Sequence, residues 1–265
     1  MVVGRGEIEV LKFCIVYEDI ADAKLASCLA DRVVCESVIW LEEDATNLEF
    51  VRQWVDAAPN GRRLRWTEID DIGRDLRLPV RRYENWESDQ PDFKAAVRAL
   101  RVIKALFDDV AVIVLIRDAD NQLNRGEGLK KARDVHLGTD RWTTVVIGLA
   151  NTKRECWVLS GYIPCNDVET KLLADERQYL GFDPTEKSHE LTAKHSESTD
   201  KRSAKRVLKK LTGENQTREE ECWTKTPLKR LRASGATNGL ADYLREVEEI
   251  LVPIIVRPEG RGVPG

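Results

Sequence analysis

The stretch that decides the fold is VAVIVLIRDADN, residues 110–121. Its first part, 110–116, is an uninterrupted run of apolar side chains, most of them β-branched. Such a run is typical of a strand that is covered on both faces of a parallel sheet. The segment before it, 93–107, places apolar side chains three and four residues apart and therefore predicts an amphipathic helix. A helix that leads into a buried strand indicates the α/β class.

Two further segments have the same strand character, LKFCIVY at 11–17 and TTVVIGL at 143–149. Helices are expected at 20–30, 128–135 and 155–159, so helices and strands alternate along the chain. The expected fold is therefore α/β, with a mostly parallel, Rossmann-like sheet that is flanked by helices. Polar interruptions blur the pattern between residues 30 and 85, where 33–40 and 64–69 are candidate strands.

The C-terminal part has a helical pattern and a different charge. One helix is expected to begin with Asp167 as its cap and to end at Gly181, and a second to open at Asp200 and stop at Gly213. A last helix is expected over 240–251. We therefore expect a catalytic domain over 8–165, a partly basic helical region over 166–256 and a disordered tail over 257–265.

Composition excludes several classes of protein. The 265 residues carry 42 Lys and Arg against 46 Asp and Glu, with 42% hydrophobic residues, which is ordinary for a soluble globular chain. No apolar run approaches the roughly 20 residues of a membrane span, and the N-terminus does not resemble a secretory signal, so a cytoplasmic protein without a membrane partner is expected. The six cysteines form no C-x-x-C pair and there are three histidines, so the chemistry is expected to depend on carboxylates.

Acidic residues follow the ends of two expected strands. Glu18 and Asp19 follow the strand at 11–17, and Asp118 and Asp120 follow the strand at 110–116. Ligands of open α/β sheets gather beyond the carboxyl ends of the strands, and Mg²⁺ is usually held there by a few carboxylates. A magnesium site is therefore one interpretation of Glu18, Asp118 and Asp120. The other is that these acids cap helices and stay solvated.

The placement of these acids resembles the signature of the TOPRIM fold, which has a glutamate after its first strand and D-x-D after a later one. The resemblance is carried by VYEDIADA at 16–23 and VIVLIRDADN at 112–121. RDADNQLNRGEGLKKAR at 117–133 and NTKRECWVL at 151–159 further resemble an uncharacterised TOPRIM-like group related to OLD-type nucleases. Many TOPRIM sequences have glycine after the glutamate, where this chain has Asp19, so the turn is expected to be shaped differently.

The resemblance implies a set of site residues and a cofactor. Glu18, Asp118 and Asp120 would be metal ligands for Mg²⁺, with Mn²⁺ as a substitute. Asp22 would either support one of these ligands from behind or bind a second metal ion. Glu155 would be an accessory acid, and Glu18 or Glu155 could act as general base. Lys153, next to Glu155 in sequence, is a catalytic candidate because it could stabilise charge on a phosphate.

The same resemblance implies phosphodiester hydrolysis. Strand passage would need a tyrosine nucleophile from another domain, for which the chain has no evident room. The usual setting of the related proteins implies an endonuclease of antiphage defence. A separate ATPase partner is expected because the chain has no G-x-x-x-x-G-K-[ST] phosphate loop.

The expected partner is nucleic acid, DNA rather than RNA. A basic segment suggests how its phosphate backbone would be bound. Residues 194–210 contain seven Lys or Arg and two acids, whereas residues 1–60 contain five Lys or Arg and twelve acids. Clustered cations bind phosphate backbones without reading sequence, although charge on a helix is often only solvation. The candidate nucleic-acid-binding residues are Lys201, Arg202, Lys205, Arg206 and Lys209. Trp157 and Trp223 are expected in the core.

Two other function classes remain open at this stage. In one, the chain is a catalytically inactive TOPRIM-like module that regulates or binds a partner protein. In the other, it is a phosphoryl-transfer domain of the receiver or haloacid-dehalogenase type, which fits less well because the D-x-D follows a late strand. The sequence leaves the oligomeric state open.

Overall fold

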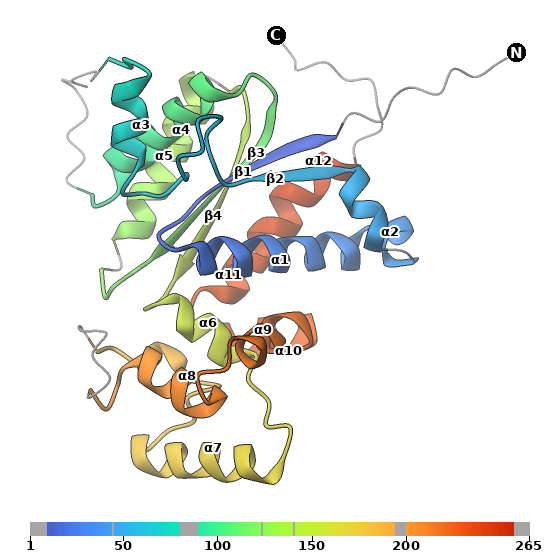
Figure 1. The fold of residues 1–265 in the computed structure, drawn as a ribbon, viewed down its shortest axis with the longest axis vertical. Helices are drawn as coiled ribbons and strands as arrows, with labels where there is room; N and C mark the ends of the chain where they lie inside the picture. The colour runs from blue at the N-terminus through green and yellow to red at the C-terminus, as the bar shows by residue number, and fades with distance from the viewer. Residues whose placement is uncertain are drawn as a thin grey trace, which may run out of the picture.

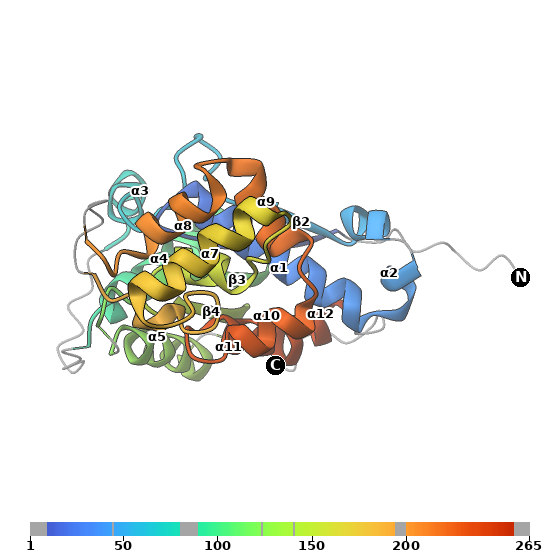
Figure 2. The same ribbon diagram turned by 90° about the horizontal axis from the view of Figure 1, so that it is seen from below.

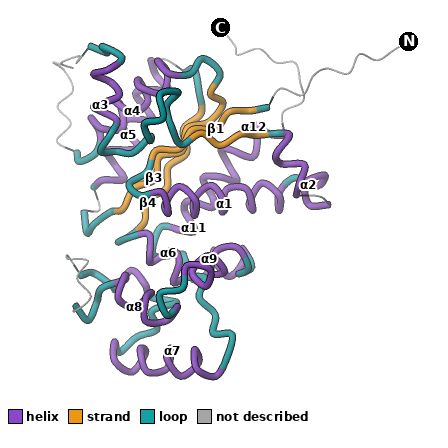
Figure 3. Tube along the Cα trace, in the orientation of Figure 1, coloured by secondary structure: helices purple, strands orange, loops and turns teal. Residues whose placement is uncertain are grey.

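The computed structural model describes residues 10–43, 45–79, 90–122, 124–139, 141–193 and 200–256. Its centre is a parallel sheet of four strands in the order β2-β1-β3-β4 (Figures 1 and 3). The strands are β1 (Leu11–Val16), β2 (Arg52–Val55), β3 (Val110–Asp118) and β4 (Thr144–Ala150). The α/β class and the parallel sheet flanked by helices are therefore confirmed.

The side chains of the central strands alternate between two cores, one on each face of the sheet. On β3, Val112 and Val114 enter one core, and Ile113 and Leu115 enter the other. This alternation follows from the period of two along a strand, and it explains why the stretch at 110–116 has no polar residue.

Helices cover both faces of the sheet (Figure 1). One face is covered by α1 (Ile20–Ser37), α11 (Leu240–Glu246) and α12 (Val252–Val256). The other face is covered by α3 (Ile69–Asp75), α4 (Phe93–Leu106) and α5 (Arg125–Thr139). Within the described residues, no helix is both long and apolar enough to cross a membrane.

Five helices form a lobe at the end of the sheet where β4 leads into α6 (Figure 1). They are α6 (Arg154–Ser160), α7 (Asp167–Leu180), α8 (Ala204–Thr212), α9 (Gln216–Thr224) and α10 (Leu228–Ser234). Helix α6 packs against α8, α9 and α10, and α7 lies beside α8 (Figure 2). This helical lobe is therefore centred on α6, the helix that directly follows β4.

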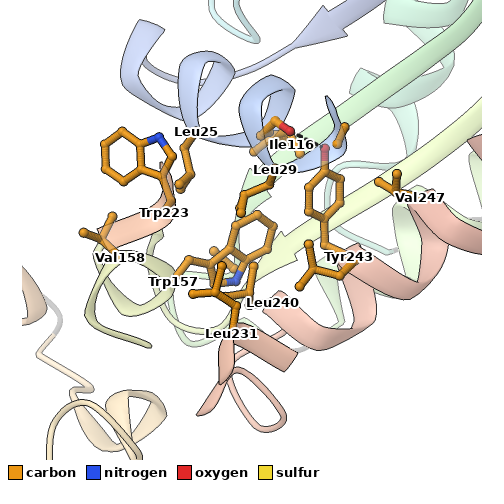
Figure 4. Packing of buried hydrophobic residues seen from close by; sticks show 14 of the residues in the cluster. Leu25, Leu29, Ile116, Trp157, Val158, Trp223, Leu231, Leu240, Tyr243 and Val247 are labelled. Atoms are coloured by element: carbon orange, nitrogen blue, oxygen red, sulfur yellow. Dashed lines mark hydrogen bonds between the residues drawn. The ribbon is translucent and has the colours of Figure 1, made fainter. Parts of the chain in front are cut away.

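The core is continuous between the helical lobe and the sheet. Trp157 of α6 stacks on Tyr243 of α11 with ring centroids 5.2 Å apart, and the Tyr243 hydroxyl donates to the carbonyl of Ala26 in α1 (Figure 4). Trp223 of α9 packs near Leu25 in the same cluster, and Arg32 of α1 donates to the carbonyl oxygens of Trp223 and Thr226. The expectation that Trp157 and Trp223 are core residues is confirmed.

The structure corrects the ambiguous region between residues 30 and 85. Residues 33–37 belong to α1, which continues far beyond residue 30, and Ile39–Glu43 forms the short helix α2. Residues 64–69 form isolated bridges and the start of α3 rather than a strand. The fourth strand is β2, which follows the 3₁₀ turn η1 (Ala45–Phe50) and has no distinct apolar pattern of its own. Strand β2 pairs with β1 alone in the sheet order and is partly exposed along its length, as an edge strand is.

Helix ends differ in detail from the expectations. Asn166 rather than Asp167 caps α7, and Ser203 rather than Asp200 caps α8, each by accepting a backbone N–H. Gly181 and Gly213 end these helices in left-handed conformations, as expected.

The last helix is α11 continued by a π turn, η3 (Val247–Leu251), and by α12. The polar region 185–203 contains the 3₁₀ turn η2 (Ser188–Glu190). The expected tail at 257–265, residues 8–9 and Lys194 lie outside the described residues.

Candidate functional site

The sequence-predicted acids meet at the carboxyl edge of the sheet. Strand β1 ends just before Glu18, its neighbour β3 ends at Asp118, and β4 ends at Ala150, which is the register partner of Asp118. The segment after β4 then opens α6 with Lys153, Arg154 and Glu155. Three adjacent strands therefore bring charged side chains to one place, the carboxyl edge of the sheet, where open α/β sheets bind their ligands.

Asp118 lies among other carboxylates. Its Oδ1 accepts a hydrogen bond from the backbone N–H of Arg154 at 2.8 Å. Burial raises the pKa of Asp118 to about 8, and the negative charges of Asp22, Glu155 and Glu18 act in the same direction. We call Glu18, Asp22, Asp118 and Glu155 the acidic group. Because these carboxylates repel one another, binding of a positive charge among them would be favourable.

Asp120 is oriented differently from Asp118. Its backbone is left-handed, with φ of 46°, and its carboxylate accepts hydrogen bonds from Lys153 Nζ at 2.8 Å and Arg125 Nη1 at 2.9 Å. Although burial works the other way, these two cations lower the pKa of Asp120. Burial lowers the pKa of Lys153, but the hydrogen bond to Asp120 outweighs burial, so the pKa of Lys153 is raised. Lys153 and Asp120 are therefore both engaged, with each other.

Glu18 has a cation beside it but no complete hydrogen bond. Arg117 Nη1 lies 3.0 Å from Glu18 Oε1. Even so, Oε1 is buried and has no hydrogen-bond partner among the residues that the structure describes. A buried carboxylate oxygen of this kind is uncommon in folded proteins and is a ready ligand for a cation.

Asp19 and Asp22 form the start of α1. Asp19 caps the helix by accepting from the Ala21 N–H, and Asp22 accepts from the Asp19 N–H at 2.8 Å, which completes a capping box. The φ of Asp19 is −122°, which is extended, so the turn does not need the glycine of the family pattern. Asp22 is 6% exposed, and Arg154 Nε lies 3.2 Å from it. Burial raises the pKa of Asp22 to about 6.

Sequence reasoning missed four residues of this region: Asp92, Arg117, Arg125 and Glu219. Arg117 and Arg125 flank the D-x-D motif, and that position was a usable signal because a basic residue beside an acidic cluster tends to pair with it. Asp92 directly precedes α4 and Glu219 lies in α9, and only tertiary packing brings them near. Burial raises the pKa of Glu219, with Arg154 and Glu155 among its charged neighbours, so the helical lobe adds an acid to the site.

The donor set fits a hard divalent cation in its chemistry but not yet in its arrangement. Within the described ranges, no three His, Cys, Asp or Glu side chains are grouped so that they could hold a metal ion. The region nevertheless carries six carboxylates, those of Glu18, Asp22, Asp92, Asp118, Asp120 and Glu155. Four basic side chains face them, those of Arg117, Arg125, Lys153 and Arg154. Glu219 of α9 is a seventh acid beside them, so carboxylates outnumber basic side chains in this region.

The candidate nucleic-acid-binding residues lie on α8 and just before it, and they are unequal. Arg206 Nη2 donates to Glu176 at 2.7 Å and also lies over the Tyr179 ring, so it holds α8 against α7. Lys209 pairs with Glu214 at 3.0 Å. Lys201 and Arg202 lie over the rings of Tyr179 and Phe182, whereas Lys205 is exposed. Arg206 therefore has a structural role, and the others remain on the surface.

Comparisons with known proteins do not identify the chain: no family model, curated protein or solved structure matches it.

Proposed function

We propose that the protein is a Mg²⁺-dependent, TOPRIM-type nuclease that hydrolyses phosphodiester bonds of nucleic acid. The observation that carries this proposal is the crowding of Asp118 by Asp22, Glu155 and Glu18 at the carboxyl edge of a parallel sheet; burial, together with these negative charges, raises the pKa of Asp118 to about 8. Like charges that are held together against their repulsion are a common mark of a site that binds a cation or a substrate.

The acidic group supplies the ligands in this proposal. Glu18 and Asp118 would hold the ion, with Asp120 and Asp22 as the further ligands that the family resemblance implies. When bound, Mg²⁺ would supply Lewis-acid stabilisation of a phosphate and a nucleophile of lowered pKa. Glu155, at the start of α6 and near Asp118, is the candidate to accept a proton.

Basic residues beside the acidic group would receive the phosphate. Lys153 lies 2.8 Å from Asp120, so its ammonium group becomes available to a phosphate when Asp120 takes part in binding a cation instead. The exposed Lys205, together with Lys201, Arg202 and Lys209, would bind the backbone of DNA further from the reacting bond. A role in antiphage defence together with an ATPase partner belongs to the same proposal, on the family resemblance alone.

One observation favours a second function, a non-catalytic binding module. Asp120, Asp22 and Glu18 each have a basic side chain of the same chain within 3.2 Å, so the charges of these predicted ligands are partly neutralised without any ion. A protein that had lost catalysis could keep such pairs as fixed structure. Binding of a divalent cation distinguishes the two functions, because only the nuclease requires it.

The test compares two aspartates at opposite ends of β3. Asp118→Asn removes a ligand while it keeps an acceptor for the Arg154 N–H. Asp109→Asn is the matched control, because Asp109 pairs with Lys12 just before the other end of the strand, away from the acidic group. Calorimetric titration with Mn²⁺ and cleavage of supercoiled plasmid in Mg²⁺ are measured for each. The nuclease predicts binding and EDTA-sensitive cleavage in the wild type and in Asp109→Asn, and loss of both in Asp118→Asn. Cleavage that persists in EDTA or in Asp118→Asn would sink the proposal, and a wild type that binds no Mn²⁺ would favour the binding module.

A further inference from the structure

A largely buried carboxylate beside the acidic group, that of Asp92, belongs to neither motif that predicted the site. Asp92 precedes α4, and its side chain is only 11% exposed. Its φ of 63° is left-handed, a conformation that Asp and Asn tolerate better than most residues. Although Asp92 stands at the N-cap position, its side chain makes no capping hydrogen bond to α4. The side chain is committed to the carboxyl edge of the sheet instead.

Asp92 holds Arg117 through two parallel hydrogen bonds. Arg117 Nε and Nη2 donate to the two carboxylate oxygens of Asp92, each at 3.1 Å. The guanidinium group also lies over the Trp66 ring, 5.4 Å from its centroid. A bidentate pair fixes the plane of a guanidinium group as well as its distance. Arg125 Nε lies 3.3 Å from the same carboxylate, so Asp92 contacts both arginines that flank the D-x-D motif.

The two hydrogen bonds between Arg117 and Asp92 affect how Arg117 meets Glu18. The remaining nitrogen of Arg117, Nη1, is 3.0 Å from Glu18 Oε1, yet that oxygen has no hydrogen-bond partner in the described part of the chain. Because Asp92 sets the plane of the guanidinium group, the N–H groups of Arg117 do not point at Glu18 Oε1. Arg117 therefore balances the charge of Glu18 without forming a hydrogen bond to this oxygen. Free of Asp92, Arg117 could turn its two-nitrogen fork to Glu18, the arrangement that carboxylates favour.

We propose that Asp92 is a positioning residue that prevents Arg117 from pairing fully with Glu18 and so keeps Glu18 able to bind a divalent cation. This inference rests on the proposed function, since it concerns the affinity of the acidic group for a metal ion. It explains why a buried aspartate stands in a left-handed conformation where it caps nothing. It also gives Arg117 a defined effect, that of a competitor for the cation.

The test is a double-mutant cycle on Mn²⁺ affinity, measured by calorimetry on the full chain without nucleic acid. Asp92→Asn, which tolerates the left-handed backbone, is expected to raise the Kd for Mn²⁺ about tenfold, the lower end for residues that orient metal ligands. Arg117→Gln removes the competitor and is expected to lower the Kd below that of the wild type. The double variant is expected to match Arg117→Gln within about twofold, because Asp92 acts through Arg117.

Two further variants keep the result interpretable. Asp31→Asn is the matched control, since Asp31 binds Arg52 by an equivalent bidentate pair at 2.8 and 2.6 Å away from the site, and it should leave the Kd unchanged. Arg117→Lys keeps the charge but loses the fork that Asp92 holds, so it should raise the Kd even if Asp92→Asn fails to fold.

The outcomes separate this inference from the proposed function. Equal Kd values for the wild type and Asp92→Asn would overturn the role of Asp92. So would a tenfold effect of Asp92→Asn that persists in the Arg117→Gln background, because it would mean that only the charge of Asp92 matters. A wild type that binds no Mn²⁺ removes both proposals, whereas a wild type that binds Mn²⁺ with either of the first two results removes this one alone.

Discussion

In the helical lobe a buried acid is paired with two cations, whereas at the carboxyl edge of the sheet a largely buried acid lies mainly among other acids. Glu176 of α7 has a fully buried side chain, and its carboxylate accepts hydrogen bonds from Arg206 at 2.7 Å and Lys210 at 2.6 Å. Although burial works the other way, these bonds lower the pKa of Glu176. Asp118 has the opposite shift, because burial and three neighbouring carboxylates raise its pKa to about 8.

The difference separates charges that stabilise the fold from charges that repel one another within it. Glu176 and Glu169 of the lobe are each matched by basic partners, so a partner lost there reduces stability. At the strand edge the acids are in excess, so their arrangement lowers stability and is kept for another reason, which we propose is ligand binding. The two regions should therefore respond in opposite directions to the same kind of substitution.

The largest expected effect is the removal of the matched acid in the lobe. Glu176→Gln keeps the shape of the side chain but leaves Arg206 and Lys210 without a counter-ion, and we expect a loss of about 3 kcal/mol in the free energy of unfolding. Urea denaturation measures it. Glu214→Gln, which removes the exposed partner of Lys209, should change stability by less than about 0.5 kcal/mol. A loss in Glu176→Gln no larger than in that control would contradict the contrast.

A second matched pair of the lobe should give a pH dependence of defined sign. Arg218 donates to both carboxylate oxygens of Glu169 at 2.8 Å, and these hydrogen bonds lower the pKa of Glu169 to about 2. Because the folded pKa lies below the unfolded value of 4.5, the stabilisation is complete above pH 4.5 and is lost as pH falls towards 2.

Comparison of Glu169→Gln with the wild type measures this effect. The wild type should be more stable by about 2 kcal/mol at pH 6, the size of a hydrogen bond to a charged group, and the difference should shrink as pH falls towards 2. Asp242→Asn, which removes an exposed pair with Arg245, is the control and should show little difference at either pH. A difference between Glu169→Gln and the wild type that stays constant with pH would refute the assignment.

The sequence predicted the parts of this contrast that depend on local pattern. The apolar run at 110–116 predicts a central strand because both faces of β3 are buried, and the same run places Asp118 at the end of that strand and Asp120 just beyond it. Strand β2 escaped prediction because an edge strand of four residues is only partly buried and has no apolar period to detect. Helix α1 extends to Ser37 because Val33 and Val34 continue its buried face, a pattern that a short window reads equally well as a strand.

The pairing of charges could not be predicted in the same way. Nothing in the sequence distinguishes Arg206, which meets a buried glutamate 30 residues earlier, from its exposed neighbour Lys205. Likewise Asp92 lies in a separate segment 25 residues before the arginine that it holds. Such pairs depend on how helices pack across a layer, and the helical period fixes only which residues share a face.

The smallest expected effect is a gain in stability at the strand edge. Asp118→Asn keeps the acceptor for the Arg154 N–H at 2.8 Å. Because the pKa of Asp118 is about 8 in the folded protein against an ordinary value of 3.8, Asp118 has to take up a proton on folding at pH 7, and asparagine avoids that cost. We expect a gain of about 1 kcal/mol in the free energy of unfolding in EDTA, and a Tm higher by a few degrees.

Addition of Mn²⁺ should reverse the order, because a cation that binds only the folded wild type stabilises it by mass action. Thermal unfolding of both proteins, with and without Mn²⁺, tests both statements. An Asp118→Asn protein that is less stable than the wild type in EDTA would show that the acidic group is matched after all, as Glu176 is, and the two regions would then differ in position but not in kind.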